Sequence, residues 1–322
     1  MAKRRLTKQQ KNRIQAIQER RRERHEHQAK AALDAGVDQP TSEGRVVIRH
    51  GATLGIEKTS GEIVQCQTRQ NIGHPVCGDR VLWQATGETT GVVTALQPRT
   101  SVLSRPDYSG REKPLAANLT QLVVVLASRP EPSGYLLDQY LVTAELIQVK
   151  PLIAINKVDL LQGEELDAFL SDYTHYEEIG YPLVRISAKR EHGLDDLIRR
   201  LKGQTSILVG QSGVGKSSLI NALLPELAVE TGRLSEATGL GRHTTSSATL
   251  YKLPQGGELI DSPGVRSFRL TELTREELEQ GFPEFRPFIG QCRFHNCTHD
   301  HEPDCAILAG VNSGQIAPQR LT

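Results

Sequence analysis

Residues 45–103 consist of short apolar and polar runs separated by glycine-containing turns. Runs of this length between glycine turns are typical of β-strands, and five of them within about 60 residues predict a small barrel of the OB type. Such barrels often bind single-stranded nucleic acid or structured RNA, although a plain packing module is the alternative. We expect Trp83 and Val81 to lie in the barrel core. The predicted strands are Arg45–Ile48, Leu54–Glu57, Glu62–Cys66, Asp79–Trp83 and Gly91–Leu96.

The pattern changes after residue 103, where continuous apolar runs alternate with helical ones. Leu122–Ala127 is apolar throughout, as expected for a strand that is buried on both faces. Alternation of such strands with helices predicts a parallel α/β sheet, and open sheets of this kind bind ligands at the carboxyl ends of their strands. Further strands are predicted at 152–155, 183–186, 206–209, 248–253 and 258–260, and helices at 135–148, 164–174, 194–201 and 217–224.

Residues 271–322 form a third kind of segment. Thr274–Gln280 is rich in glutamate and predicts a helix; proline and aromatic residues follow it, and then cysteine and histidine. The sequence therefore divides into an N-terminal extension (1–40), a barrel (41–103), an α/β domain (104–270) and a C-terminal domain (271–322).

The charge is distributed unevenly along the 322 residues, although the formal net charge is only +1. Residues 1–30 carry eleven lysines and arginines against three glutamates, and the remainder is net acidic. A basic arm on an acidic body indicates a polyanionic partner; a solvated tail is the alternative. No run of about 18 apolar residues predicts a membrane span, and the polar N-terminus is unlike a secretory signal, so we expect a cytoplasmic protein with no membrane partner.

A phosphate-binding loop follows the strand at 206–209. The pattern G-x-x-x-x-G-K-S between a strand and a helix lets backbone N–H groups surround phosphate oxygens at a helix N-terminus. Lys216 is predicted to reach the β- and γ-phosphates as a catalytic residue, and the Ser217 hydroxyl to bind Mg²⁺. The residues of this loop are Gly210, Gln211, Ser212, Gly213, Val214, Gly215, Lys216, Ser217 and Ser218.

Two motifs upstream of this loop predict guanine recognition. The N-K-x-D motif ends the strand at 152–155, and an S-A-K motif ends the next strand. The Asp159 carboxylate can accept hydrogen bonds from guanine N1–H and the exocyclic amine, a donor pair that adenine lacks. Together with the phosphate loop they predict a site for GTP and GDP. The two motifs are Asn156, Lys157, Val158 and Asp159, and Ser187, Ala188 and Lys189.

The D-x-x-G motif comes last, from Asp261 to Gly264, so the order of the motifs is a circular permutation of that in ordinary small GTPases. Asp261 is expected to hold Mg²⁺ through water, and the Gly264 N–H to contact the γ-phosphate. The loop at 239–246 offers Thr244 and Thr245 as further Mg²⁺ ligands, of which we favour Thr245.

Val265 follows the D-x-x-G motif, where Ras-like enzymes have a glutamine that orients water. Valine cannot orient water, so intrinsic hydrolysis is expected to be slow and to need an activator. His243 is the best local candidate for a catalytic role; a surface histidine without such a role is the alternative.

Four potential metal ligands lie close together near the C-terminus, in the pattern C-x₄-C-x-H-x₅-C. Three thiolates and one imidazole match a closed tetrahedral structural Zn²⁺ site, which would stabilise a domain too poor in apolar residues to fold alone. The odd number of cysteines argues against a disulfide framework, and Cys66 and Cys77 are expected to pack as small apolar residues. The predicted zinc ligands are Cys292, Cys297, His299 and Cys305.

The permuted motif order, the segment Gly239–Thr245, the segment Asp261–Arg266 and the cysteine–histidine cluster together resemble the bacterial ribosome small subunit-dependent GTPase A family. The resemblance covers roughly residues 40–320. It implies a multidomain protein with an N-terminal OB-fold barrel, a central circularly permuted P-loop GTPase of α/β type and a C-terminal α-helical zinc-binding domain. The resemblance places the nucleotide contacts of the family on Asn156–Asp159 and Gly210–Ser218, and its zinc ligands on Cys292, Cys297, His299 and Cys305. Ser246 stands where many relatives have a third threonine.

The family implies a GTPase that acts late in maturation of the small (30S) ribosomal subunit, binds 16S rRNA and is stimulated by the subunit. We expect a monomer with no DNA partner. One alternative is a GTP-gated RNA-binding switch in which hydrolysis is incidental, which Val265 keeps open. Another is a GTPase for assembly of the large subunit, although such proteins usually lack this combination of OB-fold and zinc domain.

Overall fold

The computed structural model describes residues 40–69, 72–107, 109–225, 247–262, 265 and 273–321. Nearly all of the predicted N-terminal extension, the 239–246 loop and Gly264 lie outside these ranges. The residue boundaries that the sequence predicts between domains stay predictions.

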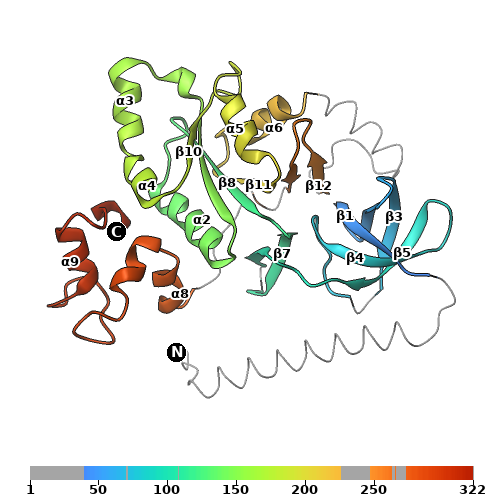
Figure 1. Ribbon diagram of the computed structural model, residues 1–322, viewed down its shortest axis with the longest axis horizontal. Coiled ribbons are helices and arrows are strands. Elements are labelled where there is room, and N and C mark those ends of the chain that lie inside the picture. Colours follow the sequence, from blue (N-terminus) through green and yellow to red (C-terminus); the bar gives the residue numbers. More distant parts are fainter. Residues whose placement is uncertain are drawn as a thin grey trace. The chain divides into compact units, whose positions relative to one another are not determined.

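The first five strands close into a barrel, as predicted (blue to cyan in Figure 1). They pair in the order β1-β2-β3-β5-β4, and a further β1–β4 pairing closes the cylinder. Trp83 and Val81 are buried in its core with Cys66, which confirms their predicted packing role. A closed five-stranded barrel of this kind is an OB-fold. The strands are β1 (Ser42–His50), β2 (Thr53–Lys58), β3 (Ile63–Thr68), β4 (Arg80–Ala85) and β5 (Thr90–Leu96).

The central α/β domain is built on the sheet order β10-β9-β8-β11-β13-β12. The first five of these strands are parallel, and β12 runs antiparallel to β13. Each strand of the predicted set is present, and the predicted parallel arrangement is confirmed for five of the six. The strand predicted at 248–253 is instead antiparallel, because only a short turn separates β12 from β13. The strands are β8 (Gln121–Ala127), β9 (Lys150–Asn156), β10 (Leu183–Arg185), β11 (Thr205–Val209), β12 (Ser247–Lys252) and β13 (Glu258–Asp261).

Both faces of this sheet are covered, because every residue of β8 is buried. Leu122 and Val124 pack in one core with helices α2 and α4, whereas Val123 and Val125 pack in a second core with α5 and α6. Alternate side chains of β8 therefore pack into two different cores, one on each face of the sheet, which explains why the strand is apolar throughout. The helices are α2 (Gly134–Leu146), η1 (Val158–Leu160), α3 (Gly163–Ser171), α4 (Thr174–Ile179), α5 (Leu194–Leu201) and α6 (Lys216–Leu223).

Two local features differ from the sequence prediction. A β-hairpin of β6 (Val102–Pro106) and β7 (Glu112–Ala117) precedes β8, and its Leu103 and Leu115 enter the α2 core. The predicted helix at 164–174 is shorter: α3 ends at Ser171, and α4 follows as a separate helix, because Tyr173 leaves the helical conformation and turns its ring into the core.

The barrel and the α/β sheet are joined by backbone hydrogen bonds. The end of β1 pairs with β12 in antiparallel register, from Ile48 opposite Thr249 to His50 opposite Ser247. The Arg45 guanidinium adds an ion pair, with its Nη1 2.5 Å from Oε1 of Glu258. β12, the strand that follows residues 226–246 in the chain, is therefore also a neighbour of the barrel.

The C-terminal region is helical, as predicted, and has its own small core of Phe282, Phe285 and Ile307. Val142 of α2 belongs to the same core. Arg320, whose side chain is fully buried, forms ion pairs with Asp138 of α2 and with Glu284. These contacts fasten the C-terminal region to helix α2 of the α/β domain. The elements are α8 (Arg275–Gln280), η3 (Pro283–Phe288), α9 (Ala306–Asn312) and η4 (Pro318–Arg320).

Within the described residues, the structure contains no helix of sufficient length and apolar character to span a bilayer.

Candidate nucleotide site and metal centre

The predicted nucleotide motifs lie at the carboxyl ends of neighbouring parallel strands. β9 ends at Asn156, β11 ends at Val209 directly before the phosphate loop, and β13 ends at Asp261. Ser187 lies two residues after the end of β10. Because parallel strands end at the same edge of a sheet, residues separated by a hundred positions in sequence meet at one edge.

Asn156 connects three of these segments. This residue is buried, with 2% of its surface exposed. The Nδ2 atom donates to the carbonyl of Val214 in the phosphate loop at 2.9 Å, and Oδ1 accepts from the backbone N–H of Ala188 at 3.0 Å. Both ends of the amide are satisfied, so Asn156 fixes the positions of the two loops relative to its own strand.

Lys157 reaches the phosphate loop from the same strand end. Its backbone is left-handed, with φ of 62°. Its ammonium group donates to the carbonyl of Gly213 at 2.6 Å and to that of Arg129 at 2.7 Å. The head of the side chain therefore lies at the phosphate loop.

Asp159 is oriented by the S-A-K motif. The hydroxyl of the buried Ser187 donates to Oδ1 of Asp159 at 2.5 Å. Ser187 is itself held by backbone hydrogen bonds with His192, which close the loop that carries Ala188 and Lys189. A carboxylate held in this way is preorganised to accept hydrogen bonds from a base.

The phosphate loop has the backbone geometry that its glycines allow. Gly210 and Gly215 have φ of 136° and 96°, and a Cβ on Gly210 would come within 2.2 Å of the Val125 carbonyl. The Lys216 ammonium donates to the carbonyls of Gly210 and Gln211 at 2.7 and 2.6 Å, which places its charge over the loop. Ser217 and Ser218 are exposed in the first turn of α6.

The D-x-x-G motif and the loop that precedes β12 are described only in part. Asp261 ends β13, and Ser262 is buried beside it. Val265 is 1% exposed and packs in the α2 core, so its side chain points away from solvent. Gly264, His243, Thr244 and Thr245 lie outside the described residues.

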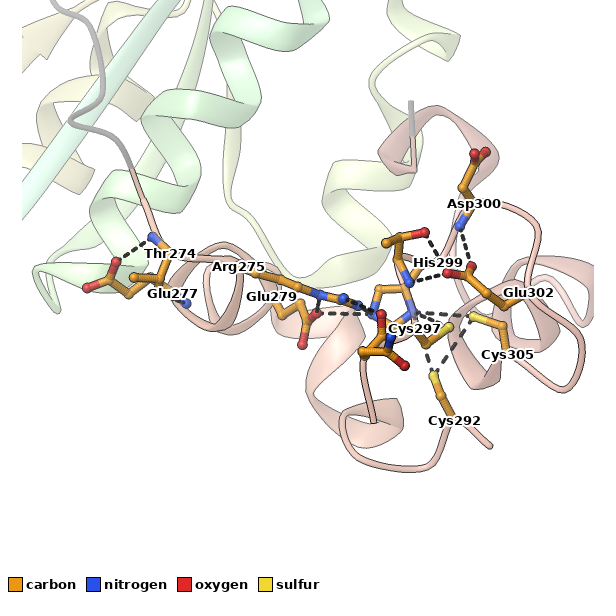
Figure 2. A network of polar contacts seen from close by, with 12 residues as sticks. Thr274, Arg275, Glu277, Glu279, Cys292, Cys297, His299, Asp300, Glu302 and Cys305 are labelled. Atoms are coloured by element: carbon orange, nitrogen blue, oxygen red, sulfur yellow. Dashed lines mark hydrogen bonds and ion pairs between the residues drawn. The ribbon is translucent and has the colours of Figure 1, made fainter. Parts of the chain in front are cut away.

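The second candidate site gathers the four predicted metal ligands. One ligand atom from each of Cys292, Cys297, His299 and Cys305 lies within 4.8 Å of the other three. The Nδ1 atom of His299 is 3.6, 3.5 and 3.3 Å from the sulfurs of Cys292, Cys297 and Cys305 (Figure 2). The sulfurs of Cys292 and Cys305 are 3.9 Å apart.

These spacings can be compared with a tetrahedral zinc site. Zn–S bonds of about 2.3 Å and Zn–N bonds of about 2.0–2.1 Å imply S···N separations of roughly 3.5 Å and S···S separations of roughly 3.8 Å. Three thiols and one imidazole at such distances fit a closed Zn²⁺ site with no position for substrate. Backbone N–H groups of Ala306 and Leu308 also point at the sulfurs of Cys292 and Cys305, as expected around thiolates.

Two nearby histidines stay apart from this cluster. His301 is exposed and pairs with Asp300, which raises its pKa, and His295 is exposed in the loop between Cys292 and Cys297. Neither belongs to the group of four ligand atoms.

Comparison with known proteins identifies the family of the chain. The model of the RsgA GTPase family matches residues 96–271. The small ribosomal subunit biogenesis GTPase RsgA of Hahella chejuensis is 46% identical over 328 aligned residues, covering 100% of this chain and 94% of the relative. The protein of the same name from Pseudomonas aeruginosa is 45% identical, with 100% and 96% covered.

The chain belongs to the RsgA GTPase family.

Solved structures support this assignment. YjeQ from Thermotoga maritima is 33% identical, with a TM-score of 0.71 and coverage of 87% of this chain and 95% of that one. YloQ, a circularly permuted GTPase, is 31% identical, with a TM-score of 0.67 and coverage of 87% and 91%. The family resemblance, the circular permutation and the three-part fold that the sequence predicts are therefore confirmed. As a member of the RsgA GTPase family, the chain binds GTP and GDP and hydrolyses GTP.

Sequence reasoning missed several contacts of these sites. The carbonyls of Arg129 and Val214 hold the N-K-x-D motif, and no side-chain pattern reveals a backbone acceptor. Arg275 and Glu279 of α8 contact the second nitrogen of His299. Their spacing of four residues on a predicted helix was a usable signal that they face the same side.

Proposed function

We propose that this GTPase acts in biogenesis of the small ribosomal subunit, in the cytoplasm, with 16S rRNA as its binding surface and with hydrolysis stimulated by the subunit. The observation that carries the proposal is the identity of 46% over the whole chain to a protein named for that process. The match extends through the barrel and the C-terminal region as well as the GTPase core. These relatives are named as GTPases of ribosome biogenesis, which does not favour the alternative of an RNA-binding switch with incidental hydrolysis.

In the proposed nucleotide complex, Asp159 reads guanine and the Ser187–Lys189 loop contacts its carbonyl. The contacts of Asn156 and Lys157 support this role, because they tie the base-reading loops to the phosphate loop. The backbone N–H groups of the loop at 210–217 surround the phosphates, and Lys216 neutralises the charge that develops on them. The ammonium of Lys216 would exchange its present carbonyl partners for phosphate oxygens.

Mg²⁺ is proposed to be held by the hydroxyls of Ser217 and Thr245 and, through water, by Asp261. Ser217 fits this role because its hydroxyl is exposed in the first turn of α6, and Asp261 ends the neighbouring strand. When bound, Mg²⁺ would supply positive charge against the β- and γ-phosphates.

Zn²⁺ is proposed to be held by Cys292, Cys297, His299 and Cys305, whose spacing fits tetrahedral coordination. When bound, it would cross-link the loops of the C-terminal region without taking part in catalysis. The core of this region is small, so the metal would contribute much of its folding energy.

The buried Val265 supports a need for external activation, because it offers no polar group to an attacking water. In the GTP state, the barrel, the basic arm and the zinc domain would dock on rRNA. Contact with the subunit would bring His243, or a group of the rRNA, to the attacking water. Hydrolysis would release the segment 261–266, which runs directly into the C-terminal region and would weaken its binding.

The test is GTP hydrolysis by the purified monomeric chain alone, with small subunits, and with large subunits as the control. Slow turnover alone and strong stimulation by small subunits only is the expected result. Equal stimulation by both subunits, or by neither, would overturn the proposed role. Lys216→Ala should abolish stimulated GTP turnover and prevent release of the protein from the subunit. If release instead depended on which nucleotide is bound, and not on hydrolysis, the result would favour a binding switch.

The coupling to the C-terminal region has its own test in the double variant Cys292→Ser, Cys297→Ser. Loss of zinc should remove stimulation by the subunit but leave guanine nucleotide binding in place. Intact stimulation in zinc-free protein would show that the coupling is wrong.

A further inference from the structure

Helix α8 is the first described helix after the D-x-x-G motif, and its start is fixed by a capping box. The Thr274 hydroxyl accepts from the backbone N–H of Glu277 at 3.1 Å, and the Glu277 carboxylate accepts from the backbone N–H of Thr274 at 2.8 Å. Reciprocal capping satisfies two backbone donors and sets the helix origin. The positions of the side chains that α8 presents one turn later are therefore well defined.

One of these side chains lies on the metal centre. Oε1 of Glu279 is 3.1 Å from Nε2 of His299, the ring nitrogen on the far side from the three sulfurs (Figure 2). The exposed fractions of the two side chains are 17% and 13%. If Nδ1 faces the metal, the neutral ring carries its proton on Nε2, and the Glu279 carboxylate is the group placed to accept it.

Arg275 holds this carboxylate from the preceding turn of α8. Its Nε donates to the same Oε1 atom of Glu279 at 2.5 Å, and its Nη1 donates to the carbonyl of Asn296 at 3.2 Å. Its Nη2 also lies 3.1 Å from Nε2 of His299, but two N–H groups cannot bond to each other. Arg275 therefore orients Glu279 and ties α8 to the loop between Cys292 and Cys297, while Glu279 orients the imidazole.

We propose that Glu279 is a positioning residue for the metal ligand His299, and that the Arg275–Glu279 pair makes α8 a structural part of the metal centre. The inference rests on the proposed zinc site and deepens it. Its consequence is that α8, the first described helix after the D-x-x-G motif, sets the orientation of one metal ligand. A displacement of α8 would then act on the metal centre directly.

The test compares the zinc affinity of full-length wild-type protein with that of Glu279→Ala, Glu279→Gln and the matched control Glu276→Ala. Glu276 is an exposed residue of the same helix. Affinity is measured by competition with a chromogenic chelator. Removal of such outer partners costs roughly 10–100-fold in metal affinity, so Glu279→Ala should lose that much. Glu279→Gln should lose less, because an amide oxygen still accepts a hydrogen bond, and Glu276→Ala should match wild type.

A spectroscopic measurement separates positioning from a general loss of stability. With Co²⁺ in place of zinc, Glu279→Ala should shift the ligand-field bands while the thiolate charge-transfer bands persist, and Glu279→Gln should restore most of the wild-type spectrum. Equal zinc affinity and equal spectra for Glu279→Ala and Glu276→Ala would overturn the inference. A wild-type protein that takes up no zinc would instead overturn the proposed metal site.

Discussion

Asn156 lies so close to Gly215 that a single methyl group would not fit between them. A Cβ atom on Gly215 would come within 2.4 Å of Nδ2 of Asn156. That nitrogen already donates to the Val214 carbonyl, next to Gly215 in the phosphate loop. The base-reading strand and the phosphate loop are thus packed directly against each other, and their geometry depends on a residue without a side chain.

Gly215→Ala should therefore weaken binding of GDP and GTP. The added methyl group would force Asn156 or the loop to move, because no real Cβ contact is as short as 2.4 Å. The matched comparison is Gly213→Ala, whose φ of 86° is similarly unfavourable for alanine but whose nearest neighbour, Cδ of Pro130, is 3.6 Å from the added Cβ. We expect Gly215→Ala to bind a fluorescent GDP analogue about tenfold more weakly than Gly213→Ala, a difference of about 1.4 kcal/mol. Equal GDP affinities of the two variants would show that the phosphate loop accommodates the added methyl group of Gly215→Ala without loss of binding.

Arg320→Met should destabilise the protein strongly. The guanidinium is fully buried between Asp138 and Glu284, whose side chains are 16% and 7% exposed, and it stacks over Phe282 with its Cζ 4.5 Å from the ring centre. Removing one partner from buried ion pairs leaves uncompensated charge and costs about 3–5 kcal/mol. Denaturant unfolding, measured for wild type and variant under the same conditions, gives this difference.

Arg293→Met is the control for that experiment. Arg293 pairs with Asp304 at 3.0 Å, but the two side chains are 62% and 69% exposed. Exposed pairs contribute about 0–1 kcal/mol, so this variant should unfold close to wild type. If the two variants were equally stable, the buried pairs of Arg320 would not be what fastens the C-terminal region to α2.

Much of the site could be predicted because each of its motifs consists of residues that are close together in the sequence. The strands before Asn156 and Asp261 are short apolar runs, and each motif follows its strand directly, so the strand ends could be located from the pattern alone. The four metal ligands lie within fourteen residues, and chain connectivity keeps them near one another. The burial of Trp83 also followed from its place in a barrel strand.

The remaining features depend on contacts between distant segments. The pairing of β1 with β12 joins residues that are 197 to 201 positions apart, and nothing in either strand specifies that partner. The β6–β7 hairpin has Pro114 inside a strand and only a few apolar positions, so it lacks a clear strand pattern. Arg320 resembles any charged residue near a chain end until the fold surrounds it with Asp138 and Glu284.

Acidification should destabilise the protein partly through His175. Its pKa is lowered from the usual 6.5, first by burial and then by the charge of Arg320, although Asp138, Glu178 and Glu284 act in the opposite direction. Among the described residues, its buried Nε2 has no hydrogen-bond partner. A folded-state pKa below the unfolded value means that the unfolded chain binds a proton first, so this contribution is intact above about pH 6.5 and is lost as the pH falls towards the folded pKa.

The measurement is the free energy of unfolding at a series of pH values between 7.5 and about 5.5, for wild type, His175→Gln and the exposed control His74→Gln. Wild type and His74→Gln should lose stability in parallel as the pH falls. His175→Gln should lose less, because glutamine does not titrate. Three parallel curves would contradict a role for His175.

Thiol accessibility should report the metal centre without any measurement of turnover. Burial raises the pKa of Cys66 to about 11 and that of Cys77 to about 12, so both barrel thiols stay protonated and shielded near pH 8. With zinc bound, we expect no rapid reaction with Ellman's reagent. A strong chelator should expose Cys292, Cys297 and Cys305, and denaturant should raise the count to all five cysteines. Three thiols released for each zinc ion captured by a metal-sensitive dye is the expected ratio. Rapid reaction of the barrel cysteines in folded protein, or no change on chelation, would contradict this assignment of structural thiols and metal ligands.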